Sequence, residues 1–324
     1  MQIENNLFLN MTAQQRAETE LDIFLVGGQA NAAGAASIAD APEEIRDHNR
    51  YENIRYCTRR PVCSGAFEEW DESCGPVQEG LGYDRAHIGP ELGMAQVMND
   101  AFAAPDKKAL IIKGAARGVT LMLSTDEGSQ YVPTKSALER YNERGSWFPF
   151  ENGATDLMHP AGMLLRNLLS FTEKMYRELT ALGFKKVHFS AMVWMQGEDD
   201  RYITRREEYP VFFKKLTERI RGKLTELTGE DYSDLPFILG EISESFSKME
   251  QLELNRYFIA LQNERLPKAV NDVHIVHTGG LEMTALNENG EQVILGSTQW
   301  HWNYADMLTA GRLFGEACLK YAKK

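Results

Sequence analysis

The 324-residue sequence is poor in cysteine, with four in all: Cys57, Cys63, Cys74 and Cys318. Four cysteines in a chain of this length are too few for a disulfide scaffold, and none belongs to a CxxC pair or lies near a helical histidine pair with zinc-ligand spacing. We therefore expect unpaired cytosolic thiols. One bridge among the three cysteines between positions 57 and 74 is the alternative.

Long apolar runs and a surplus of positive charge are also missing. No run approaches the ~20 apolar residues that span a bilayer, which excludes a membrane-spanning chain. Lysine and arginine number 35 against 47 acidic residues, a net charge of −12. Such a surface repels phosphate backbones and anionic lipids, so we expect neither nucleic acid nor membrane partners. The stretch before Asp22 lacks a secretory signal, so we expect a cytoplasmic protein, with a trimmed signal as the alternative.

The apolar residues that are present predict an α/β fold. Buried parallel strands are expected at residues 22–27, 109–114, 187–195, 236–242 and 273–278, and helices over 159–182, 207–227 and 304–321. This alternation predicts a flavodoxin-like, doubly wound, five-stranded parallel sheet with helices on both faces, in one domain over residues 1–324. It breaks at residues 31–107 and 120–157, which we interpret as insertions over the carboxyl edge of the sheet, where such folds bind ligands.

The first predicted strand ends in the sequence Gly27-Gly28-Gln29-Ala30-Asn31. A glycine pair permits a sharp turn, which presents position 30 at the start of a helix. The free N–H groups and positive dipole end of a helix start suit a developing oxyanion. Alone, this pattern is more often only a turn.

Five sequence blocks carry a more specific signal. IFLVGGQANAAG resembles the first block of the SGNH hydrolase superfamily, in the sugar acetylesterase branch (carbohydrate esterase family 6 and the sialate O-acetylesterases), where the motif reads GQSN. The other blocks follow in the expected order. They are Gly89–Gly93, which resembles GPE-LG; Lys113–Thr120, which resembles K-x-x-x-GGT; Trp194–Asp200, which resembles W-x-QGE; and His301–Asn303, which resembles the histidine block.

The resemblance implies a serine-type carbohydrate O-acetylesterase of SGNH fold that needs no metal or organic cofactor. Its substrate would be a small molecule or an oligosaccharide, with xylan- or mannan-derived oligosaccharides ahead of sialic acid. Position 30 would hold the nucleophile, and His301 would take the proton that makes a serine hydroxyl reactive. The oxyanion donors would be the N–H groups of Ala30 and Gly118 and the side-chain amide of Gln196.

Other site residues follow from the same blocks. Glu198 is the first candidate for the carboxylate that orients His301, with Asp199 and Asp200 as competitors and a solvated acidic turn as the alternative for all three. Candidate substrate contacts are Gln29, Asn31, Arg117 and Trp147. Further aromatic residues of the insertions would either stack on sugar rings or pack on the sheet; they are Trp70, Tyr83, Tyr131, Tyr141, Phe148 and Phe150.

Two positions depart from the family pattern. Ala30 has no hydroxyl, so no acyl-enzyme can form there, and loss of a triad serine costs on the order of 10⁶ in turnover. Thr298 stands three residues before His301, where the family commonly has aspartate. Because the neighbouring site residues are retained, we interpret the chain as an engineered inactive form. The alternatives are a natural carbohydrate-binding pseudoenzyme and another ester hydrolase on the same fold.

Overall fold

The computed structural model describes residues 11–63, 66–121, 147, 162–202, 206–244, 249–281, 285–286, 292–293 and 301–322. Most of the predicted insertion 120–157 lies outside these residues, and so do Thr298 and the aromatic residues Tyr131, Tyr141, Phe148 and Phe150. No helix of the described part is long and apolar enough to cross a bilayer.

A seven-stranded sheet forms the centre of the molecule, with the strand order β4-β3-β6-β1-β7-β8-β9. Its strands are β1 (Glu20–Gly28), β3 (Tyr51–Cys63), β4 (Ala66–Val77), β6 (Lys107–Ala115), β7 (Lys186–Met195), β8 (Phe237–Gly240) and β9 (Val273–Val276). Neighbouring strands are parallel except for the antiparallel pair β3 and β4. An α/β fold with a mostly parallel sheet is thus confirmed, and all five predicted strands are present.

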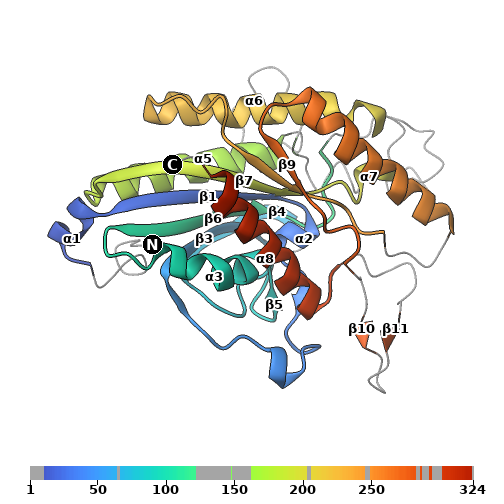
Figure 1. Ribbon diagram of the computed structural model, residues 1–324, viewed down its shortest axis with the longest axis horizontal. Coiled ribbons are helices and arrows are strands. Elements are labelled where there is room, and N and C mark those ends of the chain that lie inside the picture. The colour runs from blue at the N-terminus through green and yellow to red at the C-terminus, as the bar shows by residue number, and fades with distance from the viewer. Residues whose placement is uncertain are drawn as a thin grey trace.

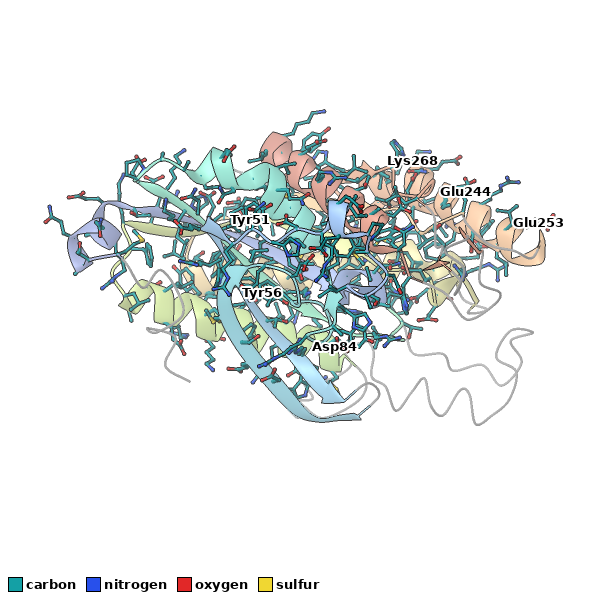
Figure 2. The ribbon with its side chains drawn as sticks, turned by 90° about the horizontal axis from the view of Figure 1, so that it is seen from below. Tyr51, Tyr56, Asp84, Glu244, Glu253 and Lys268 are labelled. Carbon is teal, nitrogen blue, oxygen red and sulfur yellow. A yellow bond between two sulfur atoms is a disulfide. The ribbon has the colours of Figure 1, made fainter. Side chains whose placement is uncertain are left out.

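The prediction of five strands is wrong because β3 and β4 lie in the segment interpreted as a loop insertion. Only Ile54–Thr58 of β3 pairs with β6, so the rest of the hairpin extends past the sheet (Figure 2). Residues 70–76 of β4 are half-buried or exposed, and a strand that is not buried on both faces needs no continuous apolar run. The charged sequence of the hairpin therefore gave no strand signal. Cys57 and Cys74 lie opposite each other in this hairpin and form a disulfide. This corrects the expectation of unpaired thiols for these two residues and agrees with the alternative of one bridge between positions 57 and 74, while Cys318 is a free thiol.

Helices cover the sheet on two sides (Figure 1). Helices α3 (Pro90–Met98) and α8 (Tyr304–Tyr321) pack together on one side, and α5 (Met163–Ala181) and α6 (Tyr209–Thr228) lie on the other, with α7 (Met249–Ala269) beside α6. The three predicted helices correspond to α5, α6 and α8, whereas α3 and α7 were not predicted. The shorter elements are α1 (Ala13–Glu18), α2 (Ala30–Ala33), β2 (Ala36–Ser37), β5 (His87–Ile88), β10 (Ala285–Leu286), β11 (Gln292–Val293) and the 3₁₀ turns Glu43–Ile45, Asn99–Phe102, Asp200–Tyr202 and Arg206–Glu208.

The contact between α3 and α8 depends on glycine. A Cβ atom on Gly93 would lie 2.2 Å from the carbonyl oxygen of Leu308, and one on Gly311 would lie 2.2 Å from that of Pro90. The two backbones therefore approach more closely than any side chain permits. This packing fixes the start of α8, which follows directly after the His301–Asn303 segment.

Candidate active site

The three central strands end at one edge of the sheet, and the motif residues follow those ends. After β1, Gly28 has φ +138°, and a Cβ there would lie 1.9 Å from the carbonyl oxygen of Met195 at the end of β7. Only glycine fits this turn. The N–H of Gln29 donates to the same Met195 oxygen at 2.9 Å, and Ala30 then begins α2. The turn after β1 is therefore attached to the end of β7.

The acidic turn after β7 joins three segments of the site. Glu198 Oε1 accepts from Asn31 Nδ2 at 2.9 Å, and Asp199 Oδ2 accepts from Gln29 Nε2 at 3.0 Å. Asp200 Oδ2 accepts from the N–H of Leu121 at 2.8 Å, in the loop that follows β6. Glu198 and Asp200 are 1% and 0% exposed, so this segment is a buried network of hydrogen bonds and not a solvated acidic turn.

The amide of Gln196 is used within that network. Its Nε2 group donates to Gln29 Oε1 at 3.3 Å and to the carboxylate of Asp200, while its Oε1 accepts from Tyr209 OH at 2.7 Å. Because Gln196 is fully buried and both of its N–H donors have partners, the structure does not support its predicted role as an oxyanion donor.

Three of the predicted substrate contacts are buried and bond to other parts of the site instead. Gln29 is 3% exposed and Asn31 is 0% exposed, and both side chains bond to the acidic turn. Trp147 is also fully buried: its Nε1 donates to the carbonyl oxygen of Gly28 at 3.1 Å, and its ring meets Trp194 at 4.8 Å between centroids. Hence none of the three presents a surface to a sugar.

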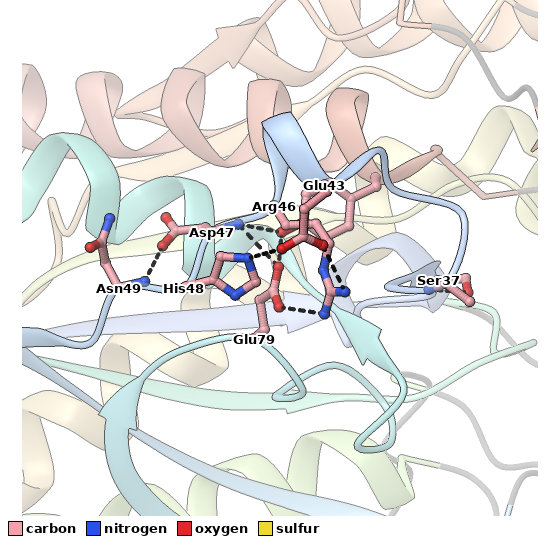
Figure 3. Close-up of polar contacts among 9 residues, drawn as sticks. Ser37, Glu43, Arg46, Asp47, His48, Asn49 and Glu79 are labelled. Carbon is pink, nitrogen blue, oxygen red and sulfur yellow. Dashed lines mark hydrogen bonds and ion pairs between the residues drawn. The ribbon is translucent and has the colours of Figure 1, made fainter.

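The histidine segment is attached on two sides. The N–H of Trp302, the residue after His301, donates to Asn31 Oδ1 at 3.2 Å. Two residues further on, Tyr304 OH donates to Glu79 and accepts from the N–H of Asp47 at 2.9 Å. Figure 3 shows the rest of this second attachment, in which Glu79 also binds Arg46 and the N–H of Asp47. No sequence pattern predicts this attachment, because Tyr304 and its partners Glu79 and Asp47 are distant in the chain.

His301 itself is half-buried, and its environment disfavours a charge. Burial, followed by the positive charges of Arg117 and His87, lowers its pKa to about 4. No carboxylate of the described residues forms a hydrogen bond or ion pair with its ring. The predicted direct contact from Glu198 is therefore not present; that carboxyl binds Asn31, and burial raises its pKa to about 7.

A second polar cluster lies near His301. His87 Nδ1 is 2.6 Å from Asp84 Oδ1, and its Nε2 is 3.1 Å from Tyr83 OH. The guanidinium carbon of Arg117 lies 4.4 Å from the centre of the Tyr83 ring. The sequence pointed to Tyr83 and Arg117 separately, and only the fold brings them together with His87.

A buried ion pair between Lys113 and Glu91 contacts the end of α2. Lys113 Nζ lies 3.0 Å from Glu91 Oε1, and it also donates to the carbonyl oxygen of Ala33, the last residue of α2, at 2.9 Å. Both side chains are nearly inaccessible. Two further motif blocks thus act by holding the turn that carries Ala30.

The two backbone N–H groups predicted to be oxyanion donors have no acceptor in the part of the chain that the structure describes. Among the described residues, none accepts a hydrogen bond from the N–H of Ala30 or of Gly118. Gly118 has φ +62°, a conformation that favours glycine. The described residues contain no group of three or more His, Cys, Asp or Glu side chains placed to hold a metal ion.

Part of the chain is similar to a known family of carbohydrate esterases. A family model described as "Carbohydrate esterase, sialic acid-specific acetylesterase" matches residues 161–299, which include the acidic turn but neither Ala30 nor His301. No curated protein sequence matches the chain.

Solved structures show the same fold at low sequence identity. A protein from Arabidopsis thaliana has a TM-score of 0.53 at 18% identity, covering 92% of this chain and 98% of its own. NanS has a TM-score of 0.58 at 15% identity, with coverage of 93% and 97%. A carbohydrate acetylesterase from Xanthomonas citri has a TM-score of 0.53 at 15% identity, with coverage of 93% and 56%. Residues 161–299 are thus similar to a carbohydrate esterase family, and the chain as a whole shares the fold of these structures.

Proposed function

We propose that this chain is a single SGNH-type domain with the active site of a carbohydrate O-acetylesterase. Only the nucleophile of that site is missing, because position 30 is alanine. The observation that carries the proposal is the hydrogen bond between Asn31 and Trp302, because it joins the residues that directly follow positions 30 and 301. The lowered pKa of His301 supports the same chemistry, and so do the N–H groups of Ala30 and Gly118, which bond to no acceptor among the described residues.

In an Ala30→Ser variant, the new hydroxyl oxygen attacks the acetyl carbonyl while His301 takes its proton. The N–H groups of residue 30 and Gly118 stabilise the oxyanion. The sugar oxygen then leaves with the proton from His301, and an acetyl-enzyme remains. Water attacks this ester with the same base, which releases acetate. In the unchanged chain, Ala30 has no hydroxyl group and the reaction does not start. The protein with Ala30 therefore binds acetylated sugars without hydrolysing them.

Two classes of acetylated sugar are candidate substrates. The sequence favours xylan- or mannan-derived oligosaccharides. A sugar acid such as an O-acetylated sialic acid is a second candidate, supported by the two basic side chains near His301 and by the description of the matching family. Arg117 in particular offers a guanidinium fork that suits a carboxylate. Its removal discriminates between the two classes.

The test is an assay of the Ala30→Ser variant on a small aryl acetate, acetylated xylo- and manno-oligosaccharides, and O-acetylated sialic acid. Ala33→Ser is the matched control, because it adds the same hydroxyl to α2 at a site equally buried, 3% against 5% exposed. We expect acetate release from the first variant only. If that variant hydrolyses no ester while the unchanged chain binds sugar tightly, the protein is a binding pseudoenzyme and the esterase proposal fails.

A further inference from the structure

We propose that Asn31 is a positioning residue that holds His301 in register with position 30, and that Glu198 acts on this register through Asn31. The proposal rests on the proposed function for its catalytic meaning. Both residues thereby receive a new role. Asn31 was predicted to contact substrate and is now a positioning residue, and Glu198 was predicted to bind His301 directly and now acts through Asn31.

Asn31 joins its own segment to that of Trp302, 271 residues further along the chain. Its Nδ2 donates to Glu198 Oε1 at 2.9 Å, and its Oδ1 accepts from the N–H of Trp302 at 3.2 Å. The side chain is 0% exposed, so water does not compete for these bonds. A side-chain amide suits this position because its NH₂ group donates on one side while its carbonyl oxygen accepts on the other.

The two hydrogen bonds of Asn31 affect the distance between position 30 and His301, because each of these residues is next in the chain to a bonded residue. Asn31 follows position 30 within the single turn of α2, and Trp302 follows His301. A shift of Trp302 relative to Asn31 therefore moves the imidazole relative to the nucleophile. Displacements of about 1 Å in such pairs can cost on the order of 10²-fold in rate.

The carboxyl group of Glu198 fixes the orientation of the amide. Because Glu198 accepts from Nδ2, the amide oxygen of Asn31 must face Trp302. Oε1 can accept this bond whether the carboxyl is ionised or neutral, so the charge of Glu198 is not needed for the register. A direct role as the orienting carboxylate of His301 would need that charge. The two roles therefore predict opposite results for a neutral isostere.

The test uses four variants in the Ala30→Ser background. We expect Asn31→Ala and Asn31→Asp to lower kcat at least tenfold with KM changed less than threefold, because the register and not substrate contact is lost. Glu198→Gln should keep kcat within threefold, whereas Glu198→Ala should lower it about as much as Asn31→Ala. Combining Asn31→Ala with Glu198→Ala should cost little beyond either change alone, because residues that act in one network are not additive.

The matched control is Asn255→Ala. Asn255 is also 0% exposed and bonds a backbone carbonyl through Nδ2, that of Ser243 at 2.9 Å, but it does not bridge the site segments. It should lower the unfolding temperature without changing kcat more than threefold. A tenfold loss of kcat in Glu198→Gln, or a kcat within threefold in Asn31→Asp, overturns the proposal.

A readout independent of activity separates this proposal from the proposed function. In the chain with Ala30 retained, Asn31→Asp should shift the NMR resonances of the His301 ring and the Trp302 amide, and Asn255→Ala should leave them unchanged. If those resonances move while the Ala30→Ser variant hydrolyses nothing, the register exists and the esterase proposal fails. If they stay in place, the register itself is refuted whatever the activity.

Discussion

Arg117 stacks on the ring of Tyr83, with its guanidinium carbon 4.4 Å from the ring centre, and its charge lowers the pKa of His301. Burial of the imidazole is the larger cause of this shift. Both effects keep the ring neutral, which is the form that accepts a proton from a nucleophile. The site therefore keeps the imidazole of His301 in the unprotonated form that a general base requires.

The first prediction concerns the acid limb of the rate profile. Because the pKa of His301 is lowered to about 4, kcat/KM of the Ala30→Ser variant on an uncharged aryl acetate should stay level down to about pH 5 and fall below it. Adding Arg117→Gln should move the limb upward, toward the ordinary histidine pKa of about 6.5. A limb that stays in place after this substitution would exclude Arg117 as a cause of the shift.

The second prediction concerns stability against pH. Burial raises the pKa of Glu198 from 4.5 to about 7, so the folded state binds this proton more tightly than the unfolded state does. The resulting stabilisation is complete below pH 4.5 and is lost as the pH rises through about 7, a change on the order of 3 kcal/mol. Urea unfolding at pH 5 and pH 8 should therefore show a smaller loss on going to pH 8 for Glu198→Gln than for the unchanged chain.

His301 contributes with the opposite sign. Its folded pKa of about 4 lies below the ordinary 6.5, so the stability that it contributes is present above pH 6.5 and is lost as the pH falls through about 4. His301→Gln should accordingly reduce the loss of stability between pH 7 and pH 4. Equal slopes in the two proteins over this range would mean that the ring is not buried as the structure has it.

The strands that carry the site were predictable from sequence, because a parallel strand buried on both faces requires an unbroken apolar run. β1, β6 and β7 all meet this condition. The hairpin β3–β4 does not, since much of it extends beyond the sheet. In the site, the blocks located the right turns, but the roles within them depend on contacts between distant segments. Asn31 and Trp302 are one such pair, and no spacing in the sequence records their hydrogen bond.

The third prediction concerns the disulfide. Cys57 and Cys74 are opposite residues of the hairpin, 17 positions apart in the chain. Cross-linking a loop of this length stabilises a fold by about 3 kcal/mol in the chain-entropy model. Replacing both cysteines by alanine should therefore lower the unfolding free energy without abolishing the fold. Alkylating the free thiols before reduction, followed by mass spectrometry, should find these two residues unlabelled; labelled residues would mean that the bridge does not form.

The fourth prediction concerns the contact between α3 and α8. A Cβ on Gly311 would lie 2.2 Å from the carbonyl oxygen of Pro90, so Gly311→Ala must push the helices apart, at a cost of about 1–3 kcal/mol. Since α8 begins directly after the His301 segment, kcat of the Ala30→Ser variant should fall as well.

Gly222 provides the control for this substitution. It lies inside α6, and a Cβ there meets nothing within 4 Å. Gly222→Ala should therefore stabilise the protein by about 0.5–1 kcal/mol through helix propensity alone, with kcat unchanged. If both alanine variants gained stability in urea unfolding, the two helices would have room for a side chain between them. The start of α8 would then not be fixed by this contact, and the position of His301 would depend on Asn31 and on the contacts of Tyr304.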